Sequence, residues 1–341
     1  MTPAIAPAFT PADAAPSRLT AADRKLFRGQ AAEVHDWMSN EEILGTIGCN
    51  FNVESCIPTV DGREYNESRL WLRSDNRDHL GTFGNRRQVI QPVDFVHYFR
   101  DFCEKSGKAI SLDIVGTPDN GKTFYMASKL LNSNLQGLME EHAGKGFNIQ
   151  KDVDAADRTD AWLIITDYYG ESSAPRGLVF LNELVCANGM TRRSESKLAG
   201  LTHLKKQNGN DVSRAILTAL EEVQVYQKIK ERLINTHITP ESARNCIISF
   251  YRPANAADGA AIKKAEKLIH LYENELIGRE LATRQNTAWG LLSAVTQYTT
   301  HNHIGDGDNA QGRAFKSLLD GPRARESRSF SDYLQSQLAA V

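Results

Sequence analysis

The sequence lacks any long uninterrupted run of apolar residues. Hydrophobic residues make up 41% of its 341 residues, yet no window approaches the ~18 consecutive apolar residues that a membrane-spanning helix needs. It also lacks a large charge of one sign, because 40 Lys and Arg are balanced by 42 Asp and Glu, a net charge of -2. We therefore expect a folded protein without a membrane partner, in which any nucleic-acid site is a local patch.

Cysteine is sparse and irregularly placed. The five cysteines are widely separated and form no CxxC pair: Cys49, Cys56, Cys103, Cys186 and Cys246. Neither a disulfide framework nor a zinc site fits this spacing, so we expect free thiols in a reducing cytoplasm and no metal or cofactor. The N-terminal residues lack the basic start and apolar core of a secretion signal.

The first residues are rich in alanine and proline. Pro3, Pro7, Pro11 and Pro16 each remove a backbone donor and disfavour helix in the preceding residue. This composition predicts a disordered segment over residues 1–30.

Residues 31–206 predict an α+β domain. Apolar and polar residues alternate at residues 69–73 and again around residue 80, which is typical of strands, whereas aromatic residues at helical spacing predict a helix from Pro92 to Gly107. Residues 109–131 and two apolar runs after Asp160 predict further paired strands. Paired strands with short connections predict a largely antiparallel sheet with packed helices.

A mostly helical region follows at residues 207–303. A long amphipathic pattern covers residues 211–235, Pro240 starts another helix, and further helices fit residues 259–281 and 286–300. Within the last of these, Trp289, Val295 and Tyr298 predict an amphipathic helix with a structural role. We expect residues 304–341 to form a loop and short helices.

Residues 116–123 match the phosphate-binding pattern GxxxxGK[ST]. In a P-loop ATPase, Gly116, Gly121, Lys122 and Thr123 would hold a nucleotide. A P-loop must however open a helix directly after its lysine, whereas the residues after Lys122 favour a strand and Pro-Asp-Asn-Gly favours a turn. We prefer the hairpin interpretation and keep the ATPase as an alternative.

Clusters of basic residues are the other candidates for a site. They are usually solvated surface, but they can also follow a phosphate backbone. The predicted nucleic-acid-binding residues are Arg86, Arg87, Arg192, Arg193, Lys197, His203, Lys205 and Lys206. A further basic group lies near the C-terminus, at Arg313, Lys316, Arg323, Arg325 and Arg328.

Several segments together resemble a family of phage- and plasmid-encoded proteins named as a domain of unknown function, family 932. The resemblance lies in residues 80–84 with the following RRQVIQP, residues 116–130, residues 184–189, His203 and residues 289–301. Family members typically carry Asn and Glu where this chain has Ser293 and Gln297. The resemblance implies a hairpin at residues 116–123 and a mobile-element setting such as DNA replication or recombination.

The order of elements is also similar to that of phage single-strand annealing proteins, which form oligomeric rings on single-stranded DNA. This similarity is at the level of fold, which does not fix function. The leading hypothesis is a non-enzymatic, homo-oligomeric protein that binds single-stranded DNA through its basic cluster, with aromatic side chains stacking on bases. The alternatives are the P-loop ATPase and a structural or host-interaction protein with solvated basic runs.

Overall fold

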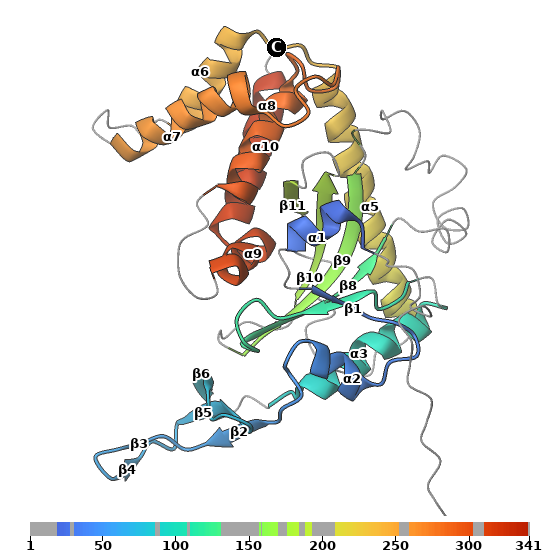
Figure 1. Ribbon diagram of the computed structural model, residues 1–341, viewed down its shortest axis with the longest axis vertical. Coiled ribbons are helices and arrows are strands. Elements are labelled where there is room, and N and C mark those ends of the chain that lie inside the picture. The colour runs from blue at the N-terminus through green and yellow to red at the C-terminus, as the bar shows by residue number, and fades with distance from the viewer. Residues whose placement is uncertain are drawn as a thin grey trace, which may run out of the picture.

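The computed structural model describes residues 19–27, 31–85, 89–107, 110–130, 157, 159–169, 176–183, 188–192, 209–251, 259–302 and 310–339. It confirms the α+β class, with antiparallel sheets followed by a helical C-terminal region (Figure 1). No helix among these residues has the length and apolar character required to cross a membrane.

The central element is a six-stranded sheet in the order β1-β7-β8-β9-β10-β11. Every neighbouring pair is antiparallel. Its strands are β1 (Ala31–Glu33), β7 (Ile114–Gly116), β8 (Thr123–Lys129), β9 (Thr159–Tyr168), β10 (Arg176–Glu183) and β11 (Asn188–Arg192). Successive side chains of a strand point to opposite sides of its sheet, so β9 contributes side chains to both faces of this sheet.

Two smaller sheets form a projection from the body (Figure 1). The first has the order β2-β5-β6, and the second is a two-stranded hairpin. Their strands are β2 (Val53–Cys56), β3 (Thr59–Val60), β4 (Arg63–Glu64), β5 (Ser68–Arg73) and β6 (His79–Gly84). Two helices flank them in the chain, α2 (Asn40–Thr46) and α3 (Pro92–Lys105). Ser39 and Glu42 form the capping box that starts α2.

The C-terminal half is helical, as predicted. Its elements are α5 (Gly209–Ile234), α6 (Pro240–Tyr251), α7 (Gly259–His270), the π-helical turn η4 (Leu271–Glu275), α8 (Ala288–His301), α9 (Ala310–Asp320) and α10 (Pro322–Ala339). The helix predicted to reach residue 281 ends earlier, because turns follow Glu275. The expectation of only short helices after residue 304 was wrong, since α10 has 18 residues.

The six-stranded sheet separates two apolar cores. Leu163 and Ile165 of β9 belong to the larger core, to which α3, α5 and α8 contribute. Trp162 and Ile164 belong to a smaller and more aromatic core, which α1 (Ala21–Phe27) and α9 cover. The two cores therefore use alternate residues of the same strand.

Helix α1 corrects the predicted disorder of residues 1–30. Phe27 is fully buried, and its ring contacts the rings of Tyr125, Trp162, Phe180 and Phe315. Burying one aromatic side chain contributes roughly 1.5–3 kcal/mol, so this anchor outweighs the weak helix propensity of a seven-residue segment. Residues 1–18 lie outside the described part of the chain.

Helix α8 forms where residues 286–300 predicted it, but it is not amphipathic. Every residue from Ala288 to Thr300 is buried, because β11, α5 and α10 surround the helix. Its polar side chains therefore form hydrogen bonds within the protein. Gln297 donates to the carbonyl of Glu275 at 3.0 Å and accepts from the amide of Ile277 at 2.9 Å.

Candidate nucleic-acid interface

Strand β11 forms one edge of the six-stranded sheet and leads into the predicted basic segment. It pairs only with β10 in the described part of the sheet, and Arg192 lies opposite Val179 at its end. Helices α8, α9 and α10 all contact β11. The fold thus brings the beginning of the 192–206 segment beside the helices that carry the C-terminal basic group, more than 100 positions later in the chain.

The described residues contain little of the predicted interface itself. Arg192 is the last residue of β11, and only its backbone is described. The other predicted members lie outside the described residues: Arg86, Arg87, Arg193, Lys197, His203, Lys205 and Lys206. Arg86 and Arg87 follow β6, which belongs to the three-stranded sheet, so the two predicted groups leave from different sheets.

Four of the five C-terminal cations fall into two groups, and the fifth, Arg328, is half-buried on α10. Lys316 lies 3.3 Å from Asp119 and above the Tyr168 ring, at 5.4 Å from its centroid. Arg323 donates to the carbonyl of Thr299 at 2.9 Å, and burial lowers the pKa of its guanidinium from the usual value. These two side chains hold the fold together and are poor candidates for phosphate contacts.

Arg313 of α9 and Arg325 of α10 are exposed instead. They lie on α9 and α10, two of the three helices that contact β11, the strand that ends at Arg192. Arginine presents a planar fork of N–H donors that fits a phosphate group. Sequence reasoning noted both residues but could not connect them with Arg192.

The GxxxxGK[ST] match forms a hairpin, as the preferred interpretation predicted. Lys122 is followed by β8 and not by a helix, and β8 pairs antiparallel with β7. Asp119 accepts hydrogen bonds from the amide of Thr123 at 2.5 Å and from its buried hydroxyl at 2.8 Å. Gly121 adopts a φ of 87°. The threonine that would bind magnesium in a P-loop is therefore occupied by an internal contact, and residues 116–123 do not form a phosphate cradle.

The tip of this hairpin serves as the docking point of α9. A Cβ added to Gly312 would lie 1.7 Å from the carbonyl oxygen of Pro118, so only glycine permits this approach. The Lys316–Asp119 pair is part of the same contact. The residues that suggested nucleotide chemistry thus position α9 beside the sheet.

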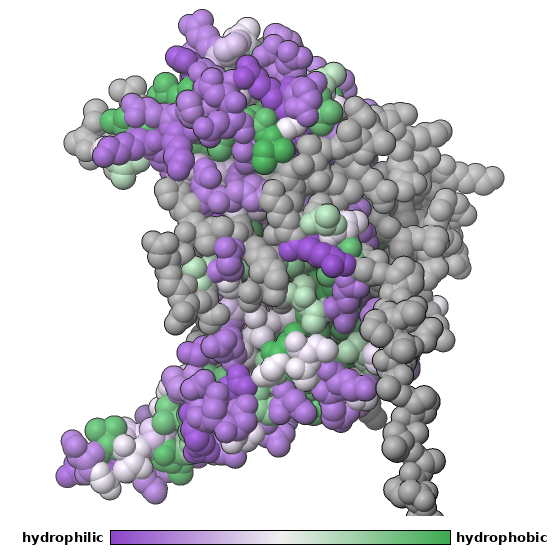
Figure 2. Space-filling view, in the orientation of Figure 1, coloured by the Kyte–Doolittle hydropathy of each residue, from purple (hydrophilic) through white to green (hydrophobic). Residues whose placement is uncertain are grey.

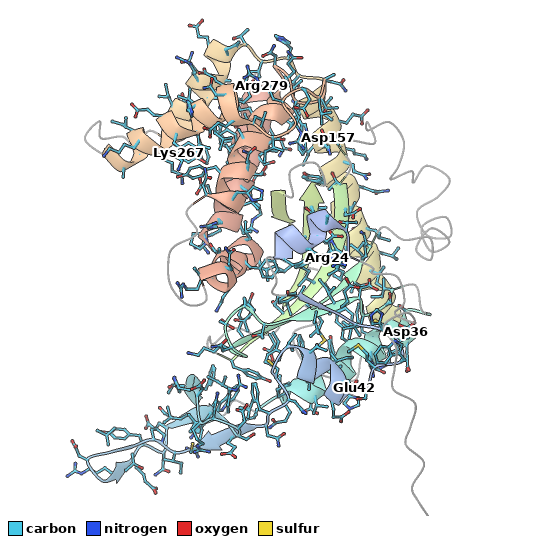
Figure 3. The ribbon with its side chains drawn as sticks, in the orientation of Figure 1. Arg24, Asp36, Glu42, Asp157, Lys267 and Arg279 are labelled. Carbon is cyan, nitrogen blue, oxygen red and sulfur yellow. The ribbon has the colours of Figure 1, made fainter. Side chains whose placement is uncertain are left out.

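Sequence reasoning missed a buried charged cluster around Asp157. Arg284 donates to Oδ1 of Asp157 from Nη2 at 2.6 Å and from Nε at 3.2 Å. Thr283 and Trp289 donate to Oδ2 at 2.7 and 3.0 Å. Nζ of Lys230 lies 3.9 Å from Oδ1 and donates to the Asp157 carbonyl at 2.6 Å. The cluster joins α5, the start of α8 and Asp157, which lies two positions before β9 (Figure 3).

The protonation of this cluster follows from its charges. Burial raises the pKa of the Asp157 carboxyl, but the charge of Lys230 and the hydrogen bonds from Arg284 and Thr283 outweigh burial and leave the pKa below its usual value. One signal was available in the sequence: Lys230 falls on the apolar stripe of α5, between buried Tyr226 and Leu233. A charge in such a position indicates a buried partner.

A second buried cluster centres on Asp23 of α1. Its Oδ1 accepts from Nδ2 of Asn182 at 2.9 Å and from Nε1 of Trp162 at 3.3 Å. Nζ of Lys129 lies 3.4 Å from Asp23 and 2.5 Å from Asp160. The cluster ties α1 to the sheet strands. Among the described residues, no three His, Cys, Asp or Glu side chains are grouped as a metal site requires.

Fold and site together define an α+β protein with two buried charged clusters and with exposed Arg313 and Arg325 on helices that contact the edge strand β11. The family model of a domain of unknown function, DUF932, matches residues 79–334, from the start of β6 into α10. This match covers well over half of the chain, which therefore belongs to the DUF932 family. No curated protein and no solved structure matches the chain significantly.

Proposed function

We propose that this protein is a non-enzymatic single-stranded-DNA-binding protein of a mobile element, with its DNA path along the surface where β11 meets α9 and α10. The observation that carries this proposal is the contact of β11 with both helices. Strand β11 leads into the basic 192–206 segment, and α9 and α10 carry exposed Arg313 and Arg325. Cations from separate parts of the chain on one surface are what a phosphate backbone requires.

The chemistry of the described residues supports binding over catalysis. The hydroxyl of Thr123 and the carboxylate of Asp119 are engaged with each other, and the Asp157 carboxylate is enclosed by its own donors. Arg313 and Arg325, in contrast, are exposed to solvent, where a ligand can reach their guanidinium groups. We therefore keep neither the P-loop ATPase nor another reaction class as a second candidate.

The direct test is the salt dependence of binding to a fluorescent oligo-dT, followed by anisotropy. Each phosphate contact on a single strand contributes about 0.7 to the slope of log K against log salt. We expect the R313A/R325A variant to bind more weakly and to lower this slope by up to about 1.4. R192A/R193A should behave in the same way if the path continues through β11.

The matched control is R244A. Arg244 is an exposed arginine on α6 that pairs with Glu273 at 2.5 Å, and α6 is not among the helices that contact β11 closely. R244A should leave both affinity and slope unchanged, and all variants should melt near the unaltered protein because exposed cations contribute only about 0–1 kcal/mol to folding. Absence of oligonucleotide binding at low salt would rule out the proposed function.

A further inference from the structure

Charged side chains from two helices surround a tyrosine of a third. Tyr298 lies on α8, Lys264 and Lys267 lie on α7, and Arg323 and Glu326 lie near the start of α10. We propose that this group, the Tyr298 seam, binds a phosphate group that carries about two negative charges. The site includes α7, which is not part of the proposed DNA path.

The seam holds two ammonium groups over one aromatic ring. Nζ of Lys264 lies 5.5 Å from the centre of the Tyr298 ring, and Nζ of Lys267 lies 5.9 Å from it. Lys264 also lies 5.0 Å from the centre of the Tyr251 ring. Two residues that are three apart on a helix lie on the same side of it, and the face of an aromatic ring attracts cations. The rings therefore hold two like charges at one place.

One carboxylate partly balances these charges. Oε1 of Glu326 accepts a hydrogen bond from the hydroxyl of Tyr251 at 2.7 Å and lies 2.7 Å from Nζ of Lys264. Lys267, in contrast, forms no ion pair within the described part of the chain. The ammonium group of Lys267 is thus able to bind an anion without giving up an internal partner.

Arg323 adds to the excess of positive charge. It donates from Nη1 to the carbonyl of Thr299, the residue after Tyr298, at 2.9 Å. Burial raises the pKa of the Tyr298 hydroxyl, and the charges of Glu326 and Arg323 shift this pKa in opposite directions, so both charges act at the seam. With the two lysines, the seam carries three cations and one carboxylate. Because Arg323 is engaged with a carbonyl, we assign the ligand contacts to the lysines.

The seam is partly buried but open on one side. Tyr298 is 7% exposed, the side chains of Lys264 and Glu326 are 30% and 21% exposed, and Lys267 is exposed. Partial burial strengthens the attraction between charges, because less water screens it. Hydrophilic residues cover this part of α7 in Figure 2, and Figure 3 labels Lys267 there.

The charge of the seam selects the class of ligand. Its three cations and one carboxylate leave an excess of two positive charges. A phosphate monoester carries about two negative charges at neutral pH and has strong acceptor oxygens, so it can bind both ammonium groups at once. Inorganic phosphate has the same chemistry. A phosphodiester within a DNA strand carries only one charge and would balance the seam less completely.

The test is isothermal titration calorimetry of the purified full chain without DNA. Inorganic phosphate is the probe, and chloride at the same ionic strength is the reference. We expect saturable binding of phosphate, which K267A should weaken about tenfold because it removes one of two charge-assisted contacts. K263A is the matched control, since Lys263 is also exposed on α7 but is not one of the lysines over the Tyr298 ring. Both variants should melt near the unaltered protein.

A second comparison distinguishes the sources of the phosphate group, with oligo-dT that carries either a 5′-phosphate or a 5′-hydroxyl. A preference for the phosphorylated strand that K267A abolishes would assign the seam to a strand end. Equal binding of the two strands, together with binding of inorganic phosphate, would assign it to a small phosphate compound.

Two results would overturn the inference: no saturable phosphate binding by the unaltered protein, or equal weakening by K263A and K267A. Because the first titration contains no DNA, its result does not depend on the DNA-binding proposal.

Discussion

Two of the buried carboxylates, Asp157 and Asp23, have similar surroundings but opposite charge balance among the described residues. Each accepts a hydrogen bond from an indole N–H, and each has a lysine nearby. Lys230 lies 4.7 Å from the centre of the Trp289 ring, and Lys129 lies 5.3 Å from that of Trp162. Two cations, Lys230 and Arg284, lie within ion-pair distance of Asp157. In contrast, the single cation Lys129 contacts the two acids Asp23 and Asp160.

This difference indicates which member of each cluster matters most for stability. At the Asp157 cluster the acid is the scarce charge, because its removal leaves Arg284 and Lys230 buried without it. At the Asp23 cluster, within the part of the chain that the structure describes, Lys129 is the cation that contacts both Asp23 and Asp160, so the lysine is the minority charge there. An unbalanced buried charge is costly, whereas removing a surplus one is tolerated better. Two clusters of the same residue types should therefore respond in opposite ways to loss of the acid and loss of the lysine.

The largest effect is expected for D157A. Arg284 is fully buried, so the variant leaves a guanidinium in the interior without its carboxylate, at a cost of about 3–5 kcal/mol. Urea unfolding followed by tryptophan fluorescence measures the free energy of unfolding. K230M is the control, because it retains the Arg284–Asp157 pair, and we expect it to lose about 1–3 kcal/mol. Equal losses for both variants would contradict the proposed charge balance.

A smaller loss of about 2–3 kcal/mol is expected for K129M. It leaves Asp23 and Asp160 as neighbouring buried acids, and part of the penalty is screened because the Lys129 side chain is 18% exposed. The order is the decisive result: K129M should cost more than D23A, whereas K230M should cost less than D157A. The reverse order at either cluster would refute the comparison.

We expect D23A to lose about 1–3 kcal/mol, because it leaves the donors of Trp162 and Asn182 without their shared acceptor. The effect should be concentrated at α1, which contributes Asp23. Hydrogen exchange should therefore become faster in residues 21–27 of this variant, while α8 stays protected. Faster exchange in both helices would mean that the two clusters are not independent.

The pH dependence gives the most gradual effect. The pKa of Asp157 is lower in the folded protein than in the unfolded chain, so its contribution is fully present above the unfolded value of about 4. This contribution is lost as pH falls from there through the folded pKa. Unfolding measured between neutral and acidic pH should show this loss in the unaltered protein and a weaker dependence in D157A. If the unaltered protein and D157A lost the same amount of stability at acidic pH, the loss would come from other carboxylates.

The sequence by itself determined the local elements. The Pro-Asp-Asn-Gly turn signal located the hairpin within residues 109–131, and Pro240 located the start of α6, because turn and helix-start signals depend on residues close in the chain. The same locality favoured a hairpin at the GxxxxGK[ST] match, because the residues after Lys122 are β-forming, and the antiparallel pairing of β7 and β8 confirms the hairpin. The resemblance to the family likewise rested on short segments and on the order in which they follow one another along the chain.

Only the tertiary structure decided which distant residues meet. No local pattern joins Asp157 to Arg284, 127 positions apart, or brings strand β11 into contact with α9 and α10. Phe27 anchors α1 although its neighbours suggested disorder, and α8 is buried on all sides because other elements surround it. Burial and charge pairing depend on every element packed around a residue, and this information is distributed over the whole chain.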